Sequence, residues 1–131
     1  MSKYTIKNFL IINFTGKNDY IGLKKDNNFF IQKIQTNNMN NDIIVISIFD
    51  FLKKYNITLN ETFSIIVNQG PGRFSAIRSS LAVAKGLKIA KKIRLYGYKD
   101  ELMIKFNLQN IEFLIKKNLL ENKLIKPVYL S

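Results

Sequence analysis

The chain has 131 residues and a formal net charge of +12, from 21 Lys and Arg against nine Asp and Glu. It contains neither Cys nor His, which excludes disulfides and thiolate sites and removes the commonest general base and metal ligand. No apolar run reaches the about 18 residues of a membrane span, and the start lacks the pattern of a secretory signal, so a cytoplasmic, single-domain protein is expected.

Three short segments near the start, at 9–13, 20–24 and 29–36, have the apolar or alternating pattern of strands. Turn residues separate them at 15–18 and 25–28. Strands joined by tight turns predict an antiparallel meander, which a polar loop at 36–42 follows.

The next apolar segment, Ile43 to Tyr55, has two interpretations. Its β-branched residues favour a strand, whereas its length favours a helix capped by Asn41 or Asp42 and closed by lysines. We expect the helix, although the pattern of 43–52 alone leaves both open.

A continuous apolar run at 63–67 predicts a buried strand parallel to the first. A long helix is predicted from Phe74 to Ile93, and a short strand from 94 to 98. One face of this helix carries Phe74, Ile77, Leu81 and Ala84. A second face carries the small residues Ser79, Ala82, Gly86 and Ala90.

A last helix is predicted from Asp100, as its cap, to about Lys117, with Leu102, Phe106, Phe113 and Leu114 among its apolar positions. An extended tail, Pro127 to Leu130, follows. The order of elements predicts an α/β fold, the ribonuclease-H-like half of the actin-like ATPase architecture, with a mixed sheet flanked by helices. We expect this lobe at 1–100 and a helix with an extended tail at 101–131.

The loop Gly70-Pro71-Gly72 joins a predicted strand to a helix. Such loops present backbone N–H groups to anions at a helix N-terminus, but no Gly-Lys-Ser/Thr follows, so it is not a P-loop. The other interpretation is a tight turn, with Ser75 as the helix cap. The turn is favoured, and an anion site stays open.

Acid–base and metal chemistry find little support in the sequence. The fold class places a carboxylate at the end of the first strand, where this chain has Asn13, which is neither a base nor a strong metal ligand. The nine acidic residues are scattered at predicted turns and helix ends. No catalytic residue, metal site or cofactor is therefore predicted.

The two long helices have more apolar and small surface than one sheet needs. Glycine inside a helix costs about 1 kcal/mol relative to alanine, so Gly86 is expected to have a packing reason. It allows close contact either with the domain's own sheet or with another subunit, and both interpretations remain open. The positive charge is interpreted mainly as dispersed lysine excess, with a smaller chance of RNA contact.

The segment from Gly70 to Arg78, with Ala84-Lys85-Gly86-Leu87 beyond, resembles the signature of the bacterial TsaB family, Gly-Pro-Gly-Ser-Phe-Thr-Gly-Leu-Arg followed by Ala-Lys/Gln-Gly-Leu. The tail at 127–130 resembles the family's closing Pro-x-Tyr-Leu-Arg. The chain departs from the pattern at Arg73, Ser75, Ala76, Ser80, Asn13 and Ser131. Residues 101–131 stand where the family has a second lobe, so they are expected to be its remnant, without a cleft for ATP.

The resemblance implies a non-catalytic scaffold that binds the enzyme TsaD and, with TsaE, serves the attachment of threonylcarbamoyl to tRNA. Its interface would use the first two helices, and the bare chain would form homodimers. The expected partner-binding residues are Ile44, Ile48, Phe51, Leu52, Tyr55, Ser79, Ala82, Gly86 and Ala90. The expected structural loop residues are Gly70, Pro71, Gly72, Arg73, Phe74 and Arg78. The alternatives are a ribonuclease-H-like nuclease or small ATPase, and a basic RNA-binding module.

Overall fold

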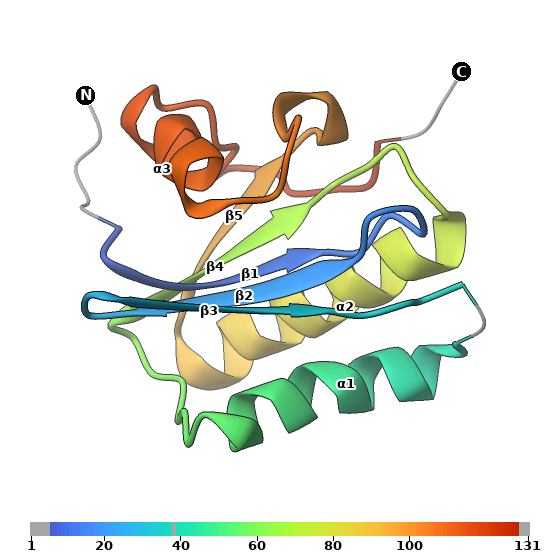
Figure 1. The fold of residues 1–131 in the computed structure, drawn as a ribbon, viewed down its shortest axis with the longest axis horizontal. Coiled ribbons are helices and arrows are strands. Elements are labelled where there is room, and N and C mark those ends of the chain that lie inside the picture. The colour runs from blue at the N-terminus through green and yellow to red at the C-terminus, as the bar shows by residue number, and fades with distance from the viewer. Residues whose placement is uncertain (1–5, 38, 129–131) are drawn as a thin grey trace.

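A mixed sheet between two layers of helices forms the centre of the computed structural model, which describes residues 6–37 and 39–128 (Figure 1). The strands are β1 (Asn8–Asn13), β2 (Tyr20–Lys25), β3 (Asn28–Lys33), β4 (Phe63–Asn68) and β5 (Arg94–Tyr98). Their order across the sheet is β3-β2-β1-β4-β5. Helices α1 (Asn41–Lys54) and α2 (Phe74–Lys91) lie side by side on one face, and α3 (Leu108–Lys116) lies on the other.

The sheet combines the two pairing modes that the sequence predicts. β1, β2 and β3 form an antiparallel meander, and β4 and β5 then add in parallel beyond β1. The third strand is shorter than predicted, because it ends at Lys33 rather than at Thr36. Ile34 N–H still donates to the carbonyl of Asp19 at 2.9 Å, one residue beyond the pair of Tyr20 with Lys33.

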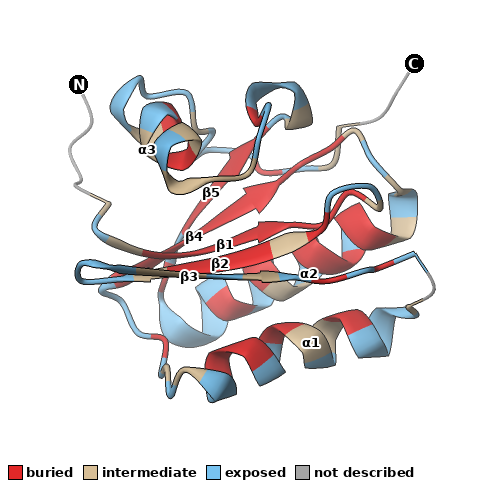
Figure 2. Ribbon diagram, in the orientation of Figure 1, coloured by how far each residue is buried: buried red, intermediate tan, exposed pale blue. Residues whose placement is uncertain are grey.

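Both faces of the central strands are buried, as Figure 2 shows. In β1, Leu10 and Ile12 belong to the larger core, beneath α1 and α2. Phe9 and Ile11 belong to the smaller core, with Ile111 and other residues of the α3 side. The alternation of side chains along a strand explains this division. It also explains why β1 reads as a continuous apolar run.

The segment at 43–55 is helical, which confirms the interpretation from its length. The N-cap is Asn40, not Asn41 or Asp42 as predicted, and its side chain accepts a hydrogen bond from Ile43 N–H at 2.9 Å. The strand alternative based on β-branched residues is wrong here. An apolar face that the larger core buries outweighs the weak intrinsic propensity of these residues.

α2 begins at Phe74, close to the predicted start, but its first turn differs from expectation. Arg73 occupies the N-cap position without a side-chain capping bond, and Ser75 lies inside the helix, so the predicted Ser75 cap is wrong. Phe74, predicted on the same face of the helix as Ile77, Leu81 and Ala84, is 55% exposed, whereas those three are buried. The guanidinium of Arg78 lies 5.0 Å from the centre of its ring.

The last helix is shorter than predicted. Asp100–Leu102 forms only a 3₁₀ turn, and α3 begins at Leu108, where Asn107 caps it by accepting from Asn110 N–H at 2.8 Å. Between them, Phe106 stacks on Tyr20 with ring centres 5.1 Å apart. An irregular linker with bends, in which Phe106 is half-buried against Tyr20, therefore replaces the first half of the predicted helix.

Within residues 6–37 and 39–128, no helix has the length and apolarity needed to cross a lipid bilayer. Pro127 and Val128 have no regular secondary structure, and the rest of the predicted extended tail lies outside the described residues. The C-terminal segment pairs with β5 at one point, through hydrogen bonds of 2.8 and 2.7 Å between Gly97 and Glu121.

Candidate functional site

Three connections meet at the edge of the sheet where β1 and β4 end. They are the β1–β2 loop, the β3–α1 connection and the Gly70-Pro71-Gly72 loop before α2. Gly70 has φ +98°, which favours glycine, and a Cβ there would lie 2.9 Å from the carbonyl oxygen of Val128. A Cβ at Gly72 would lie 3.0–3.1 Å from atoms of Thr15. The glycines therefore permit close packing of neighbouring chain segments.

The N–H groups around this loop bond within the chain. Gly70 N–H donates to Asn68 Oδ1 at 2.7 Å, and Arg73 N–H donates to the carbonyl of Thr15 at 2.7 Å. Asp100 N–H donates to the carbonyl of Gly70 at 2.9 Å. Since two of the donors that an anion would use are occupied, the geometry favours the turn over the anion site.

Arg73 takes part in a closed ring of hydrogen bonds. Its guanidinium Nη2 donates to the carbonyl of Thr36, and its own N–H donates to Thr15. Asp19 Oδ2 accepts from Thr36 N–H at 2.9 Å and from Thr36 Oγ1 at 2.5 Å. Asp19 Oδ1 accepts from Thr15 N–H at 2.8 Å and from Gly16 N–H at 2.7 Å. The ring joins all three connections.

The two charged residues of the ring, Asp19 and Arg73, both bond Thr36. The carboxylate of Asp19 is buried and accepts from four donors, as a buried charge requires. The stem of Arg73 packs over Gly16, where a Cβ would lie 2.7 Å from the Cβ of Arg73. This explains Gly16, which sequence reasoning treated only as a turn residue.

Asn13 ends β1 as predicted and lies in a buried polar cluster. Its Oδ1 accepts from Asn68 Nδ2 at 2.8 Å and from the hydroxyl of Tyr98, and its Nδ2 donates to the carbonyl of Asn18 at 2.8 Å. Asn68 Nδ2 also donates to Asp100 Oδ1 at 3.0 Å. Both lone pairs of Asn13 Oδ1 are thus occupied, so this oxygen is not available to a metal ion or a water nucleophile.

Tyr98 completes this cluster as a neutral phenol. Its full burial, and then the nearby negative charge of Asp100, raise the pKa of Tyr98 well above its ordinary value, despite a hydrogen bond from Asn68 that lowers it. The hydroxyl therefore remains a donor to Asn13 throughout the physiological range. Among the described residues, no group of three or more acidic side chains is placed to hold a metal ion.

Most of the partner-binding residues predicted on α1 lie in the core. Ile44, Ile48, Phe51 and Leu52 are at most 5% exposed beneath the sheet, so the prediction that they face a partner is wrong. Tyr55 is half-buried and stacks on Phe30 with ring centres 4.3 Å apart. The helical period correctly groups these residues on one stripe of the helix, but it does not show what the stripe contacts. In the structure this stripe packs on the chain's own sheet.

The predicted residues of α2 divide in a different way. Ser79 is buried, and its Oγ donates to Asn41 Oδ1 of α1 at 2.5 Å. Ala82, Gly86 and Ala90 are exposed. A Cβ at Gly86 would meet no atom within 4 Å. Close contact with the chain's own sheet is therefore not the reason for glycine at this position.

The opposite side of α1 provides the apolar surface that the sequence left unassigned. Ile43, Ile46 and Phe49 are 43%, 54% and 47% exposed. They lie on α1, which is adjacent to α2 on the same face of the sheet (Figure 1), and Val45 of α1 and Ala82 of α2 line one groove. We call these the α1–α2 face, which consists of Ile43, Val45, Ile46, Phe49, Ala82, Gly86, Ile89 and Ala90. Burial, not periodicity, was the signal needed to find it.

A groove of about 480 Å³ adjoins this face between the N-terminal halves of α1 and α2. Val45 and Ala82 line it together with Phe74 and Arg78 of the predicted structural loop. Arg78 is exposed. Phe74 and Arg78 thus border the helix pair instead of supporting the loop from within.

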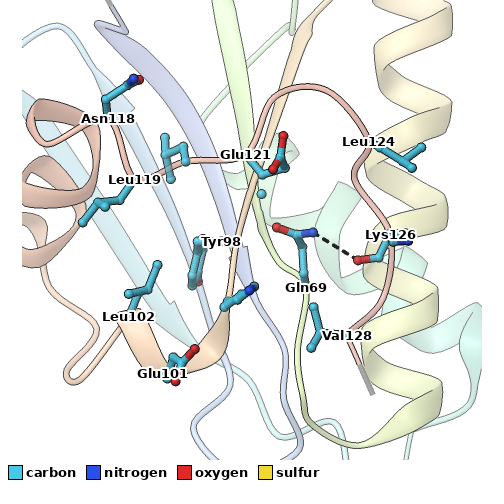
Figure 3. Close-up of a pocket in the computed structure, with 13 residues that line it drawn as sticks. Gln69, Tyr98, Glu101, Leu102, Asn118, Leu119, Glu121, Leu124, Lys126 and Val128 are labelled. Atoms are coloured by element: carbon cyan, nitrogen blue, oxygen red, sulfur yellow. Dashed lines mark hydrogen bonds between the residues drawn. The ribbon is translucent and has the colours of Figure 1, made fainter. Parts of the chain in front are cut away.

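A second hollow, of about 560 Å³, lies between β5 and the C-terminal segment (Figure 3). Gln69 reaches into it and donates from Nε2 to the carbonyl of Lys126 at 3.1 Å. Leu102, Leu119 and Leu124 line its walls. Gln69 thus holds the C-terminal segment, because its carbonyl also accepts from Val128 N–H at 2.8 Å.

The sequence matches known proteins over about half of the chain, which for the family model is the part that carries α1, β4, α2 and β5. A family model described as TsaD, tRNA N6-adenosine threonylcarbamoyltransferase, matches residues 37–100. The tRNA threonylcarbamoyladenosine biosynthesis protein TsaB of Buchnera aphidicola subsp. Baizongia pistaciae (strain Bp) is 39% identical over 67 residues. The match spans 51% of this chain and 30% of that relative.

Two solved structures from Pseudomonas aeruginosa share the fold with a TM-score of 0.67 each. One is described as an uncharacterized protein with similarity to peptidase YEAZ, at 16% identity over 76% of this chain and 46% of that one. The other is YeaZ, a name also used for TsaB, at 14% identity over 86% of this chain and 50% of that one. The fold is thus the actin-like, ribonuclease-H-like lobe that the sequence predicts, over about half the length of these relatives. In sequence over about half of its length, and in fold, the chain is similar to proteins named TsaB or YeaZ.

Proposed function

We propose that this chain is a non-catalytic scaffold subunit that binds a TsaD-type enzyme in the complex that makes threonylcarbamoyladenosine in tRNA. The observation that carries the proposal is the α1–α2 face, where three large apolar side chains are exposed on α1 and small residues are exposed on the adjacent helix α2. Exposed apolar surface on this scale often marks a site of protein–protein contact. A role on tRNA places the chain in the cytoplasm.

The nature of the partner is supported by the match to the TsaD family model. The matched residues, 37–100, contain both α1 and α2. A TsaD-type enzyme is therefore expected to have an equivalent helix pair, and two like faces can pack together around a pseudo-twofold axis. In this arrangement Gly86 allows the partner's backbone to come close, which accounts for the open space around it.

The absence of catalysis is proposed from the saturated hydrogen bonds of Asn13. In a ribonuclease-H-like nuclease or an ATPase, this position would supply a carboxylate to a metal ion or water. Here the amide donates to one carbonyl and accepts from two donors, in a pattern that a carboxylate does not match. The chemistry is therefore assigned to the partner, with TsaE in the wider complex.

The same face predicts the behaviour of the chain without its partner. Exposed Ile46 and Phe49 favour association of two copies through an isologous contact. Sedimentation at increasing concentration is expected to show a reversible homodimer that dissociates when the TsaD-type enzyme is added. A monomer at the highest concentration would contradict this part of the proposal. The assignment of residues 101–131 as the remnant of a second lobe stays a proposal.

Co-purification with the TsaD-type enzyme tests the function. The wild-type chain is expected to form a complex, and Gly86→Leu is expected to abolish it without unfolding the chain, because the new side chain enters open space. Circular dichroism of Gly86→Leu provides the folding control. Absence of a complex with the wild type would refute the function, and a full-strength complex with Gly86→Leu would refute the interface.

A further inference from the structure

The positive charge of the chain is concentrated in one segment. No Asp or Glu occurs from 62 to 99. The same 38 residues contain eight basic residues, Arg73, Arg78, Lys85, Lys88, Lys91, Lys92, Arg94 and Lys99. Eight of the 12 net positive charges therefore belong to β4, α2, β5 and their connections. Only five of the 18 lysines lie in this segment, so its charge arises from the absence of carboxylates and from the three arginines.

The fold gathers many of these charges at one end of the molecule. α1 and α2 both end at the edge of the sheet where β4 and β5 begin, on the left of Figure 1. Exposed lysines mark this edge at the ends of both helices. We call them the basic end, which consists of Lys53, Lys54, Lys88, Lys91 and Lys92.

The acidic residues nearby do not neutralise the basic end. Asp50 lies three and four residues before Lys53 and Lys54 on α1, which is the spacing of helical ion pairs. Two further exposed carboxylates lie in this region, Glu61 in the loop before β4 and Asp26 in the β2–β3 turn. The C-terminus of each helix adds about half a negative charge. The α2 lysines have no acidic residue on their own helix.

We propose that the basic end binds the phosphate backbone of RNA. Lysine is a compact positive charge on a flexible stem, which suits contacts to phosphates that do not depend on base sequence. Several such charges on one edge produce a local positive potential that attracts a polyanion. The proposal rests on the proposed function, since a complex that acts on tRNA brings RNA to the chain.

The basic end is separate from most of the α1–α2 face. Lys88 lies two residues from Gly86 and so on the opposite side of α2, Lys92 follows the helix as its left-handed C-cap, and Ala82 lines the groove shared with α1. Ile43 and Ile46 are near the start of α1, far along the helix from Lys53. The chain can therefore bind an enzyme partner and RNA at the same time.

Binding of unmodified tRNA to the isolated chain at several salt concentrations tests the proposal. The test variant replaces Lys53, Lys88, Lys91 and Lys92 with Gln. The control replaces four exposed lysines around α3 with Gln, namely Lys105, Lys116, Lys117 and Lys123. Both variants lose the same charge, so only the position of the lysines differs between them.

The test variant is expected to weaken tRNA binding at least tenfold at low salt, and to lower the slope of log K against log salt by about 3 to 4. The control is expected to retain affinity within about threefold. Equal losses in both variants would overturn the proposal in favour of dispersed charge. Failure of the wild type to bind tRNA at low salt would overturn it outright.

The TsaD-type enzyme is titrated with the same two variants, which separates this proposal from the proposed function. Both variants are expected to bind the enzyme like wild type. If the test variant loses the enzyme while keeping tRNA, the basic end is a contact for an acidic protein and the RNA proposal is overturned. If neither the wild type nor the variants bind the enzyme, while tRNA binding follows the prediction, only the proposed function fails.

Discussion

Arg73 and Asp19 hold Thr36 from opposite sides. The guanidinium of Arg73 bonds its carbonyl, and the carboxylate of Asp19 bonds its N–H and hydroxyl. Thr36 is fully buried and lies in the connection that leads into α1, while Arg73 stands directly before α2. The pair therefore fixes the starts of the two helices that form the proposed partner-binding face.

The first prediction concerns the energetic coupling of this pair. Asp19→Asn is expected to destabilise the fold by about 2 kcal/mol, because bonds to a charged acceptor contribute roughly 1.5–3 kcal/mol each and an amide cannot accept from all four donors. Arg73→Ser is expected to cost only about 1 kcal/mol. It removes the bond to Thr36, but it also removes the buried Nε–H, which has no partner among the described residues and is itself unfavourable. Urea denaturation of both single variants and the double variant measures the effects.

The double variant decides whether the two residues act together. Because both bond Thr36, their effects are expected to be non-additive by about 0.5 kcal/mol or more. Strict additivity would contradict the ring. Arg94→Ser, which removes an exposed arginine outside the ring, is a matched control and is expected to leave the coupling unchanged.

The second prediction concerns Asn13→Asp, which restores the carboxylate that the fold class places at the end of the first strand. The new oxygen faces the carbonyl of Asn18 instead of donating to it. We expect a loss of about 2 kcal/mol of stability, from an unmade bond and an imperfectly compensated buried charge. Neither nuclease nor ATPase activity is expected in metal titrations. Activity in this variant would show that only one atom separates the site from catalysis.

The third prediction concerns alkaline pH. The pKa of Tyr98 is raised in the folded state by burial and then by Asp100, so the folded chain keeps its phenolic proton more tightly than the unfolded chain does. The stability that Tyr98 contributes is therefore fully present below pH of about 10 and is lost as pH rises above it. Tyr98→Phe is expected to flatten this alkaline decrease in the free energy of unfolding. An unchanged decrease would contradict the assignment.

The fourth prediction concerns Gly86→Ala. Since a Cβ at this position meets no atom within 4 Å, the substitution is expected to raise the stability of the isolated chain by about 0.5–1 kcal/mol through helix propensity. The same methyl group is expected to weaken binding of the TsaD-type enzyme. Thermal unfolding and a binding titration measure the two effects. A gain in both stability and affinity for the enzyme would mean that Gly86 does not lie at the interface.

The sequence predicts the fold well because β1 and β4 are continuous apolar runs and clear turn residues separate β1, β2 and β3. The helix at 43–55 could be inferred from length, although its direction could not, because both stripes of α1 are apolar and only the position of the sheet distinguishes them. The linker before α3 was missed because Asn107, its actual cap, resembles any polar residue inside a helix.

The candidate site was predictable in part. The Gly-Pro-Gly loop and Asn13 stand where the pattern places them. The ring of Asp19, Thr36 and Arg73 was not predictable, because its members are far apart in sequence and meet only when the meander and the two helices are assembled. Gly86 attracted attention as a helical glycine, and the open space around it could come only from the structure.

A titration of the TsaD-type enzyme with two matched variants tests the central claim most directly. Ile46→Lys places a charge on the α1–α2 face, where Ile46 is 54% exposed, and Ile104→Lys places the same charge at a 93% exposed position beyond β5. Neither change disturbs a buried side chain, so both variants are expected to fold. The account predicts that Ile46→Lys weakens binding at least tenfold, or about 1.4 kcal/mol, and that Ile104→Lys binds like wild type. Equal affinity of the two variants would contradict it.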